Sequence, residues 1–133
     1  MNIKPLKECP VLDKIRERFA VDERTLCITY FPNLYADASV DPILLAHEQI
    51  HLKQQEKIGA EKWWKQYLKD DNFLKNQESE AYRDQAKFVK EKVKDRNLRA
   101  RILHKLVTDF SGEMYGGVIS REEAENVIIK TWP

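Results

Sequence analysis

The sequence contains few of the residues that mark specialised classes of protein. Its 133 residues include only two cysteines, four glycines and five prolines, and no segment is repeated or of low complexity. So few cysteines exclude a disulfide-rich scaffold, and neither Cys9 nor Cys27 stands in a CxxC or other metal-ligand spacing. We therefore expect two free thiols that take no part in chemistry.

Long hydrophobic runs and an excess of one charge are also lacking. No apolar run approaches the roughly 20 residues that cross a bilayer, and the net charge is only +1. Residues 87–105 are basic, but their charges alternate in sign, as is typical of solvated helices. We therefore expect neither a nucleic acid nor a membrane as a partner. The first residues, "MNIKPLKECPVLDKIRERF", lack the apolar segment of a secretion signal, which predicts a cytoplasmic location.

The residues that are present predict an α+β fold, mostly α, in one domain over residues 1–133. Apolar side chains recur at helical spacing along most of the chain. The stretch "RTLCITYFPNLYADAS" is the most β-like, with a strand near 26–30 and a turn or second short strand after Pro32. Asp41-Pro42 reads as a helix start, and Ser120 and Glu123 form a capping box. We expect helices over residues 11–19, 42–57, 60–69, 74–93, 97–109 and 121–129.

The stretch "LLAHEQIHLKQQ", residues 44–55, places His47 and His51 four residues apart, with Glu48 directly after the first. Positions i and i+4 share one face of a helix, so both imidazoles can reach one metal ion. Glu48 is rotated by about 100° from His47, beside the metal rather than on it, where a general base would stand. The flanking apolar residues indicate a buried helix, in which each imidazole needs a partner for its nitrogens.

A catalytic zinc site usually has three protein ligands and leaves a fourth position for water. The third histidine, His104, falls on the far side of its helix from the apolar residues, which predicts a surface position. Carboxylates remain, and the segment "NQESEAYRDQAKFV" offers Glu78, Glu80 and Asp84.

Helical geometry separates these carboxylates. The apolar residues of this helix fall within about 80° of Glu78, whereas Glu80 is rotated by roughly 200° to the opposite face, near Asp84. A carboxylate in the middle of an apolar face is costly unless it is paired or bound to a metal. This favours Glu78 as the third ligand and a solvated position for Glu80, which stays the alternative.

An HExxH helix followed by a helix that supplies a glutamate resembles the gluzincin branch of zinc metallopeptidases. The local form "ESEAY" is similar to the ExxA third-ligand helix of small, single-domain members, the minigluzincins and phage-like forms. The resemblance covers residues from about 25 to 90. It implies a zincin-like domain with a short β-sheet packed on the HExxH helix and a second active-site helix carrying the third ligand.

The resemblance also implies an activity, the hydrolysis of a peptide or protein substrate. Zn²⁺ would be held by His47, His51 and Glu78, with Glu48 as the general base. The strand at 26–30 would be the sheet edge that pairs with the extended substrate.

The sequence departs from the family pattern in two places. The 26 residues between His51 and Glu78 include an extra segment, "AEKWWKQYLKDDN", whose aromatic residues we expect to pack in the core rather than to form a partner surface. No residue clearly matches the histidine or tyrosine that stabilises the oxyanion in larger members. Tyr82 and Tyr115 offer that chemistry, but we expect both to be packing residues.

Two functional alternatives stay open. One is a zinc-containing scaffold or interaction protein without useful turnover, and the other is a regulatory protease of narrow specificity. The C-terminal segment from Tyr115 onward either leaves the cleft open or plugs it.

Overall fold

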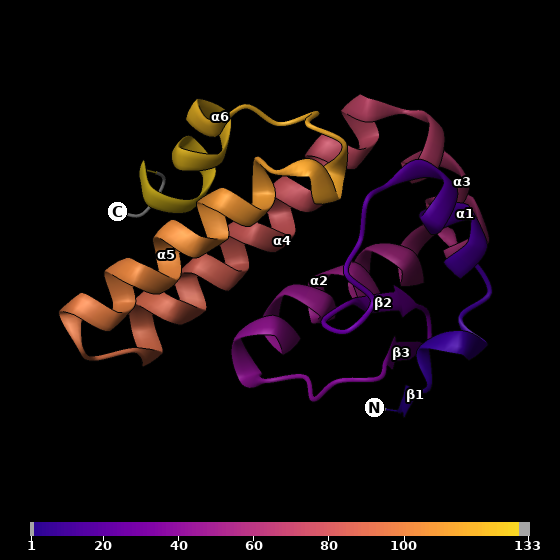
Figure 1. Ribbon diagram of the computed structural model, residues 1–133, viewed down its shortest axis with the longest axis horizontal. Coiled ribbons are helices and arrows are strands. Elements are labelled where there is room, and N and C mark those ends of the chain that lie inside the picture. Colours follow the sequence, from indigo (N-terminus) through magenta and orange to yellow (C-terminus); the bar gives the residue numbers. More distant parts are fainter. Residues whose placement is uncertain (1, 131–133) are drawn as a thin grey trace.

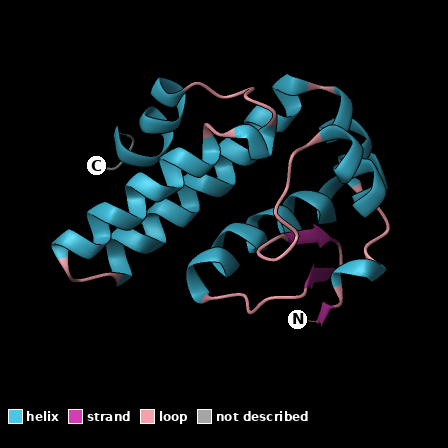
Figure 2. Cartoon of the chain, in the orientation of Figure 1, coloured by secondary structure: helices cyan, strands magenta, loops and turns pink. Residues whose placement is uncertain are grey.

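The computed structural model describes residues 2–130 and confirms the predicted fold class, a mostly helical α+β protein. A small sheet lies at the N-terminal side of the molecule, and helices account for most of the rest (Figures 1 and 2). None of the described helices is long and apolar enough to cross a membrane. Cys9 and Cys27 are both free, as predicted.

Within the described residues the sheet has three strands in the order β1-β3-β2. β1 (Ile3–Lys4) pairs parallel to β3 (Asn33–Ala36), and β2 (Cys27–Tyr30) pairs antiparallel to β3 with Thr29 opposite Leu34. β2 is therefore an edge strand, as predicted. The sequence did not predict β1, because two residues are too few for any periodic pattern to show.

The long helix α2 (Pro42–Ile58) begins where its sequence signals place it. The Asp41 carboxylate accepts a hydrogen bond from the backbone N–H of Leu44 at 2.9 Å, and proline occupies the first turn. The helix ends at Gly59, whose φ of 91° favours glycine. These two signals fix where the helix that carries the histidines begins and ends.

Gln55 of α2 ties this helix to the edge of the sheet. Its Nε2 donates to the Thr29 carbonyl at 2.9 Å, and its Oε1 accepts from the Phe31 N–H at 2.7 Å. The side chain is fully buried. It thus takes the place of a neighbouring strand along part of β2 and sets the distance between the sheet and α2.

Two further helices follow in close succession, α3 (Ala60–Lys69) and α4 (Asp71–Lys92). The Asp70 carboxylate accepts from two backbone N–H groups of the first turn of α4, so α4 begins earlier than the predicted start at Leu74. α4 packs along α2, and this is the most extensive helix pair among the described residues. Trp63, Trp64 and Tyr67 of α3 are all buried, which confirms the prediction that they pack in the core.

The C-terminal part of the chain packs against α4. α5 (Arg96–Phe110) runs beside α4 in Figure 1, and the capping box predicted at Ser120 and Glu123 begins a short helix. The last predicted helix is divided, because its second half forms a π-helical turn. The remaining described elements are η1 (Leu6–Glu8), α1 (Leu12–Arg18), η2 (Glu113–Tyr115), α6 (Arg121–Glu125) and η3 (Asn126–Lys130).

Candidate metal centre

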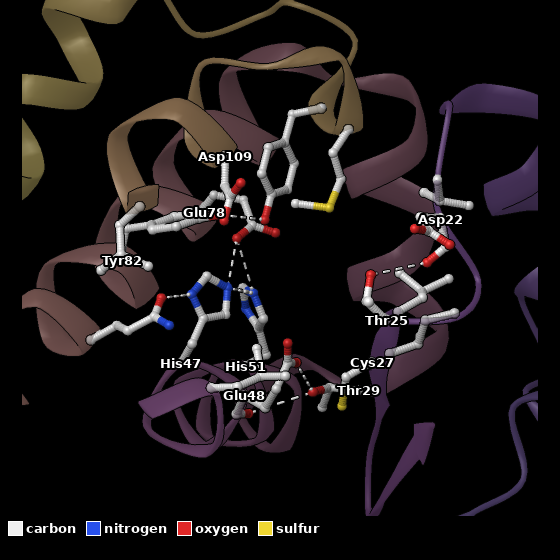
Figure 3. Close-up of a pocket in the computed structure, with 18 of the residues that line it drawn as sticks. Asp22, Thr25, Cys27, Thr29, His47, Glu48, His51, Glu78, Tyr82 and Asp109 are labelled. Atoms are coloured by element: carbon white, nitrogen blue, oxygen red, sulfur yellow. Dashed lines mark hydrogen bonds and ion pairs between the residues drawn. The ribbon is translucent and has the colours of Figure 1, made fainter. Parts of the chain in front are cut away.

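The interface between α2 and α4 brings together three of the predicted site residues. His47 and His51 point from α2 toward Glu78 on α4 (Figure 3). The Oε1 atom of Glu78 lies 3.0 Å from His47 Nε2 and 3.2 Å from His51 Nε2, and the two Nε2 atoms are 3.2 Å apart. All three side chains are buried, and their ligand atoms are close enough to hold one metal ion.

The spacing of these atoms fits a tetrahedral ion. With bonds of about 2.0–2.1 Å, two ligand atoms of a tetrahedral zinc ion are roughly 3.3 Å apart. The three separations of 3.0–3.2 Å are close to that value. Two imidazole nitrogens and one carboxylate oxygen are also a donor set that suits a divalent transition metal.

The outer nitrogens of the two imidazoles are held by amide oxygens. Nδ1 of His47 donates to Gln85 Oε1 at 2.9 Å, and Nδ1 of His51 donates to Gln54 Oε1 at 2.8 Å. Because an amide oxygen only accepts, each Nδ1 keeps its proton. Each Nε2 is thereby left to present its lone pair to the centre of the cluster.

Glu78 is held in a similar way from α3. The Tyr67 hydroxyl donates to Glu78 Oε2 at 2.6 Å, which leaves Oε1 facing the two histidines. Tyr67 belongs to the segment "AEKWWKQYLKDDN", which lies between His51 and Glu78 in the sequence. That segment therefore completes the surroundings of the cluster and does not merely lengthen the connection.

The histidines and the glutamate of the cluster strongly shift the pKa values of His51 and Glu78. Burial lowers the pKa of His51, but the Glu78 carboxylate outweighs burial and raises this pKa to about 9. Burial raises the pKa of Glu78, but the two histidines outweigh it and hold the pKa of this carboxyl well below its usual range. The pocket between the three side chains thus favours a cation, which is either a proton on His51 or a metal ion.

Glu48 lies beside this group and not within it. Its Oε2 accepts from the Thr29 hydroxyl of β2 at 2.5 Å, and the side chain is buried. Figure 3 shows Glu48 between His51 and Thr29. The rotation along α2 expected from the sequence is therefore present.

A cleft of about 800 Å³ reaches the cluster. Figure 3 shows Asp22 and Thr25 across the cleft from Glu78. Lys105 is the only lysine or arginine among the described residues that line it. Of the described C-terminal residues 115–130, only Tyr115 lines the cleft, so this part of the chain does not plug it.

The other sequence candidates lie outside the cluster. Glu80 is exposed on α4, and its Oε1 accepts from Gln54 Nε2 at 2.7 Å. His104 is exposed on α5, as predicted. Tyr82 and Tyr115 are buried with their hydroxyls 2.9 Å apart, and the Tyr82 ring packs edge-on against a cluster histidine. Both tyrosines are therefore packed, as expected.

The sequence did not reveal the four side chains that hold the cluster residues and Glu48: Thr29, Gln54, Tyr67 and Gln85. Two of them carry a local signal. Gln54 follows His51 by one turn, and Gln85 follows Glu78 by two turns at a rotation of only about 20°. Thr29 and Tyr67 come from separate elements, and their contacts arise only from the tertiary fold.

The fold and the cluster define the class of this protein as a small α+β domain with a buried His–His–Glu group that is able to bind a metal ion. This description is compatible with a zincin. A scan against protein-family models, a search of curated proteins and a search of solved structures each find no significant match to the chain.

Proposed function

We propose that the chain is a zinc-dependent metallopeptidase of the gluzincin type, with zinc held by His47, His51 and Glu78. One observation carries the proposal: three donor atoms from two helices converge within 3.0–3.2 Å of one another on the wall of a cleft. The three residues are buried, and all three line the cleft, which gives access to the cluster. A catalytic zinc site needs such an open position, whereas a structural site is closed by a fourth ligand.

Zinc bound there would supply Lewis acidity, lowering the pKa of a water from about 15.7 toward 7 and polarising the scissile carbonyl. Glu48 would accept the proton from the attacking water and pass it to the leaving amine. The Thr29 hydroxyl holds Glu48 Oε2 at 2.5 Å and leaves Oε1 for this transfer. The hydrogen bond also keeps the carboxylate in one orientation beside the metal ligands.

An extended peptide would lie along β2, the edge strand that lines the cleft. Part of this edge is already occupied, because the Thr29 carbonyl accepts from Gln55 Nε2 and from Trp64 Nε1, each at 2.9 Å. We therefore place the substrate against the Cys27 end of β2. This position brings its backbone past Glu48 and the two histidines.

The test combines metal analysis with an unbiased peptide library. We expect one zinc per chain by atomic absorption, and cleavage that a chelator abolishes and added zinc restores. The Glu48→Gln variant should keep its zinc while its rate falls by about 10²–10⁴-fold, because it cannot take up the proton. Glu56→Gln, which changes an exposed glutamate on the same helix, serves as the matched control and should cleave normally.

Two results would count against the proposal. A Glu48→Gln variant that cleaves as fast as the unmodified chain would exclude Glu48 as the base. Zinc bound at full occupancy without cleavage of any library peptide would favour the scaffold interpretation.

A further inference from the structure

Glu80, the exposed carboxylate of α4, is connected to the metal-binding cluster through one buried side chain. Its Oε1 accepts from Gln54 Nε2 at 2.7 Å, and Gln54 Oε1 in turn accepts from His51 Nδ1 at 2.8 Å. Gln54 is only 8% exposed. One amide group thus links a carboxylate at the surface of α4 to a histidine of α2.

Both ends of the Gln54 amide are occupied, and this fixes its orientation. Besides Glu80, Nε2 also donates to the backbone carbonyl of Gln77 at 3.0 Å. An amide turned by 180° would place its oxygen against these two acceptors and its NH₂ group against the N–H of His51. Glu80 and the Gln77 carbonyl therefore keep the amide oxygen directed at Nδ1 of His51.

His47, the other histidine of the cluster, is held by a single hydrogen bond to a glutamine. Nδ1 of His47 donates to Gln85, and among the described residues Gln85 makes no second side-chain hydrogen bond. His51 is thus the ligand whose orientation depends on a chain of two hydrogen bonds ending in a carboxylate. A hydrogen bond to a charged acceptor is stronger than a hydrogen bond to a neutral acceptor, and it polarises the next hydrogen bond in the series.

We propose that Glu80 is a positioning residue of the metal centre: through Gln54 it holds His51 with Nε2 turned toward the ion. The proposal rests on the proposed function only in that it takes His47, His51 and Glu78 to bind zinc. Outer partners of metal-binding histidines typically change metal affinity by about 10–100-fold when they are removed. Glu80, one bond further out, should have a smaller effect.

Zinc affinity measured by competition with a chromophoric chelator tests the proposal. We expect Glu80→Ala to weaken zinc binding by about three- to tenfold, and Glu80→Gln, which keeps an acceptor oxygen but loses the charge, to restore part of the affinity. Asp84→Ala removes an exposed carboxylate one turn further along the same helix and is the matched control. In the Co²⁺-substituted protein, Glu80→Ala should also alter the visible absorption bands, which respond to ligand geometry and not to stability.

A double-mutant cycle shows whether Glu80 acts through Gln54. Gln54→Met keeps the length of the side chain and removes the amide, and it should weaken zinc binding by about 10–100-fold. Adding Glu80→Ala to this variant should then have no further effect, because the connection is already broken. Thermal unfolding of each metal-free variant confirms that the fold is retained.

The proposal is overturned if Glu80→Ala binds zinc as tightly as Asp84→Ala. It is also overturned if Glu80→Ala loses the same affinity in the Gln54→Met background as in the unmodified chain. If the chain binds zinc but cleaves no peptide, the peptidase proposal fails and the role of Glu80 is still decided by these affinities. A chain that binds no zinc would overturn both proposals.

Discussion

Two regions of the molecule bury very different side chains. The polar region is formed by β2, α2 and α4 as far as Gln85. Among the described residues, it contains all of the buried histidine, glutamate and glutamine side chains and the buried Thr29. The apolar region, formed by the rest of α4 together with α5, α6 and η3, buries aliphatic residues and Phe110. α4 belongs to both regions, with Glu78 in its first half and Val89 in its second.

The difference between their buried side chains indicates the role of each region. A buried polar group costs free energy unless it is hydrogen-bonded, and none of the buried side-chain polar atoms of the described residues lacks a partner. Such a network gives less stability than apolar packing of the same volume, but it fixes side chains in defined positions. We infer that the apolar region stabilises the fold and that the polar region holds the proposed metal site, so that substitutions should affect the two separately.

The largest effect should come from a cavity in the apolar region. Ile128 of η3 is fully buried, and Ile128→Ala should lower the free energy of unfolding by about 2–5 kcal/mol. Urea denaturation of the metal-free protein measures this change, and Ile58→Ala, at a residue that is 40% exposed, is the control. Zinc affinity of the folded variant should stay within about twofold of the unmodified chain. A tenfold loss of zinc affinity would mean that the two regions are not independent.

The converse change removes the proposed ligand Glu78 from the polar region. Zinc sites with four ligands bind with about 10–16 kcal/mol, or roughly 2.5–4 kcal/mol per ligand, so Glu78→Ala should weaken zinc binding by about 10²–10³-fold. Far-UV circular dichroism should remain that of a helical fold, because the apolar region is unchanged. Glu80→Ala should lose far less zinc. Equal zinc content in the two variants would contradict the assignment of Glu78 as the third zinc ligand.

The sequence predicted the parts of the fold and the site that have local causes. The start of α2 at Asp41-Pro42 and the capping box at Ser120 were found because the signals lie within one turn. The two histidines were predicted from their i, i+4 spacing and Glu78 from its place on an apolar helix face, and the fold brings these three side chains together.

Contacts between distant segments could not be predicted in this way. Tyr67 reaches Glu78 only because α3 folds back beside α4, and Thr29 reaches Glu48 only because β2 lies against α2. Glu80 shows the same limit: its helix face predicted a solvated charge, and its exposure is as expected. Its hydrogen bond to Gln54 depends on the packing of α4 on α2, which no single helix pattern contains.

The smallest of the three effects is a dependence of zinc binding on pH. In the metal-free protein the Glu78 carboxylate, acting against burial, raises the pKa of His51 to about 9. Zinc must displace this proton, so its apparent affinity should rise by about tenfold for each pH unit up to pH 9 and then level off. Chelator competition at pH 6.5, 7.5 and 8.5 measures the slope. A flat profile would show that His51 does not exchange a proton for the metal.

The proton on His51 should also make the stability of the metal-free protein depend on pH. This stability should fall as the pH rises, whereas the zinc affinity should increase. Because the pKa of His51 in the folded protein lies above its ordinary value of 6.5, the pair of His51 and Glu78 stabilises the metal-free fold fully below about pH 6.5. This contribution is lost as the pH rises through about 9. The stability lost in Ile128→Ala should be the same at both ends of this range, because no titrating group is involved. A loss that varied with pH would show that titration in the polar region alters the packing of the apolar one.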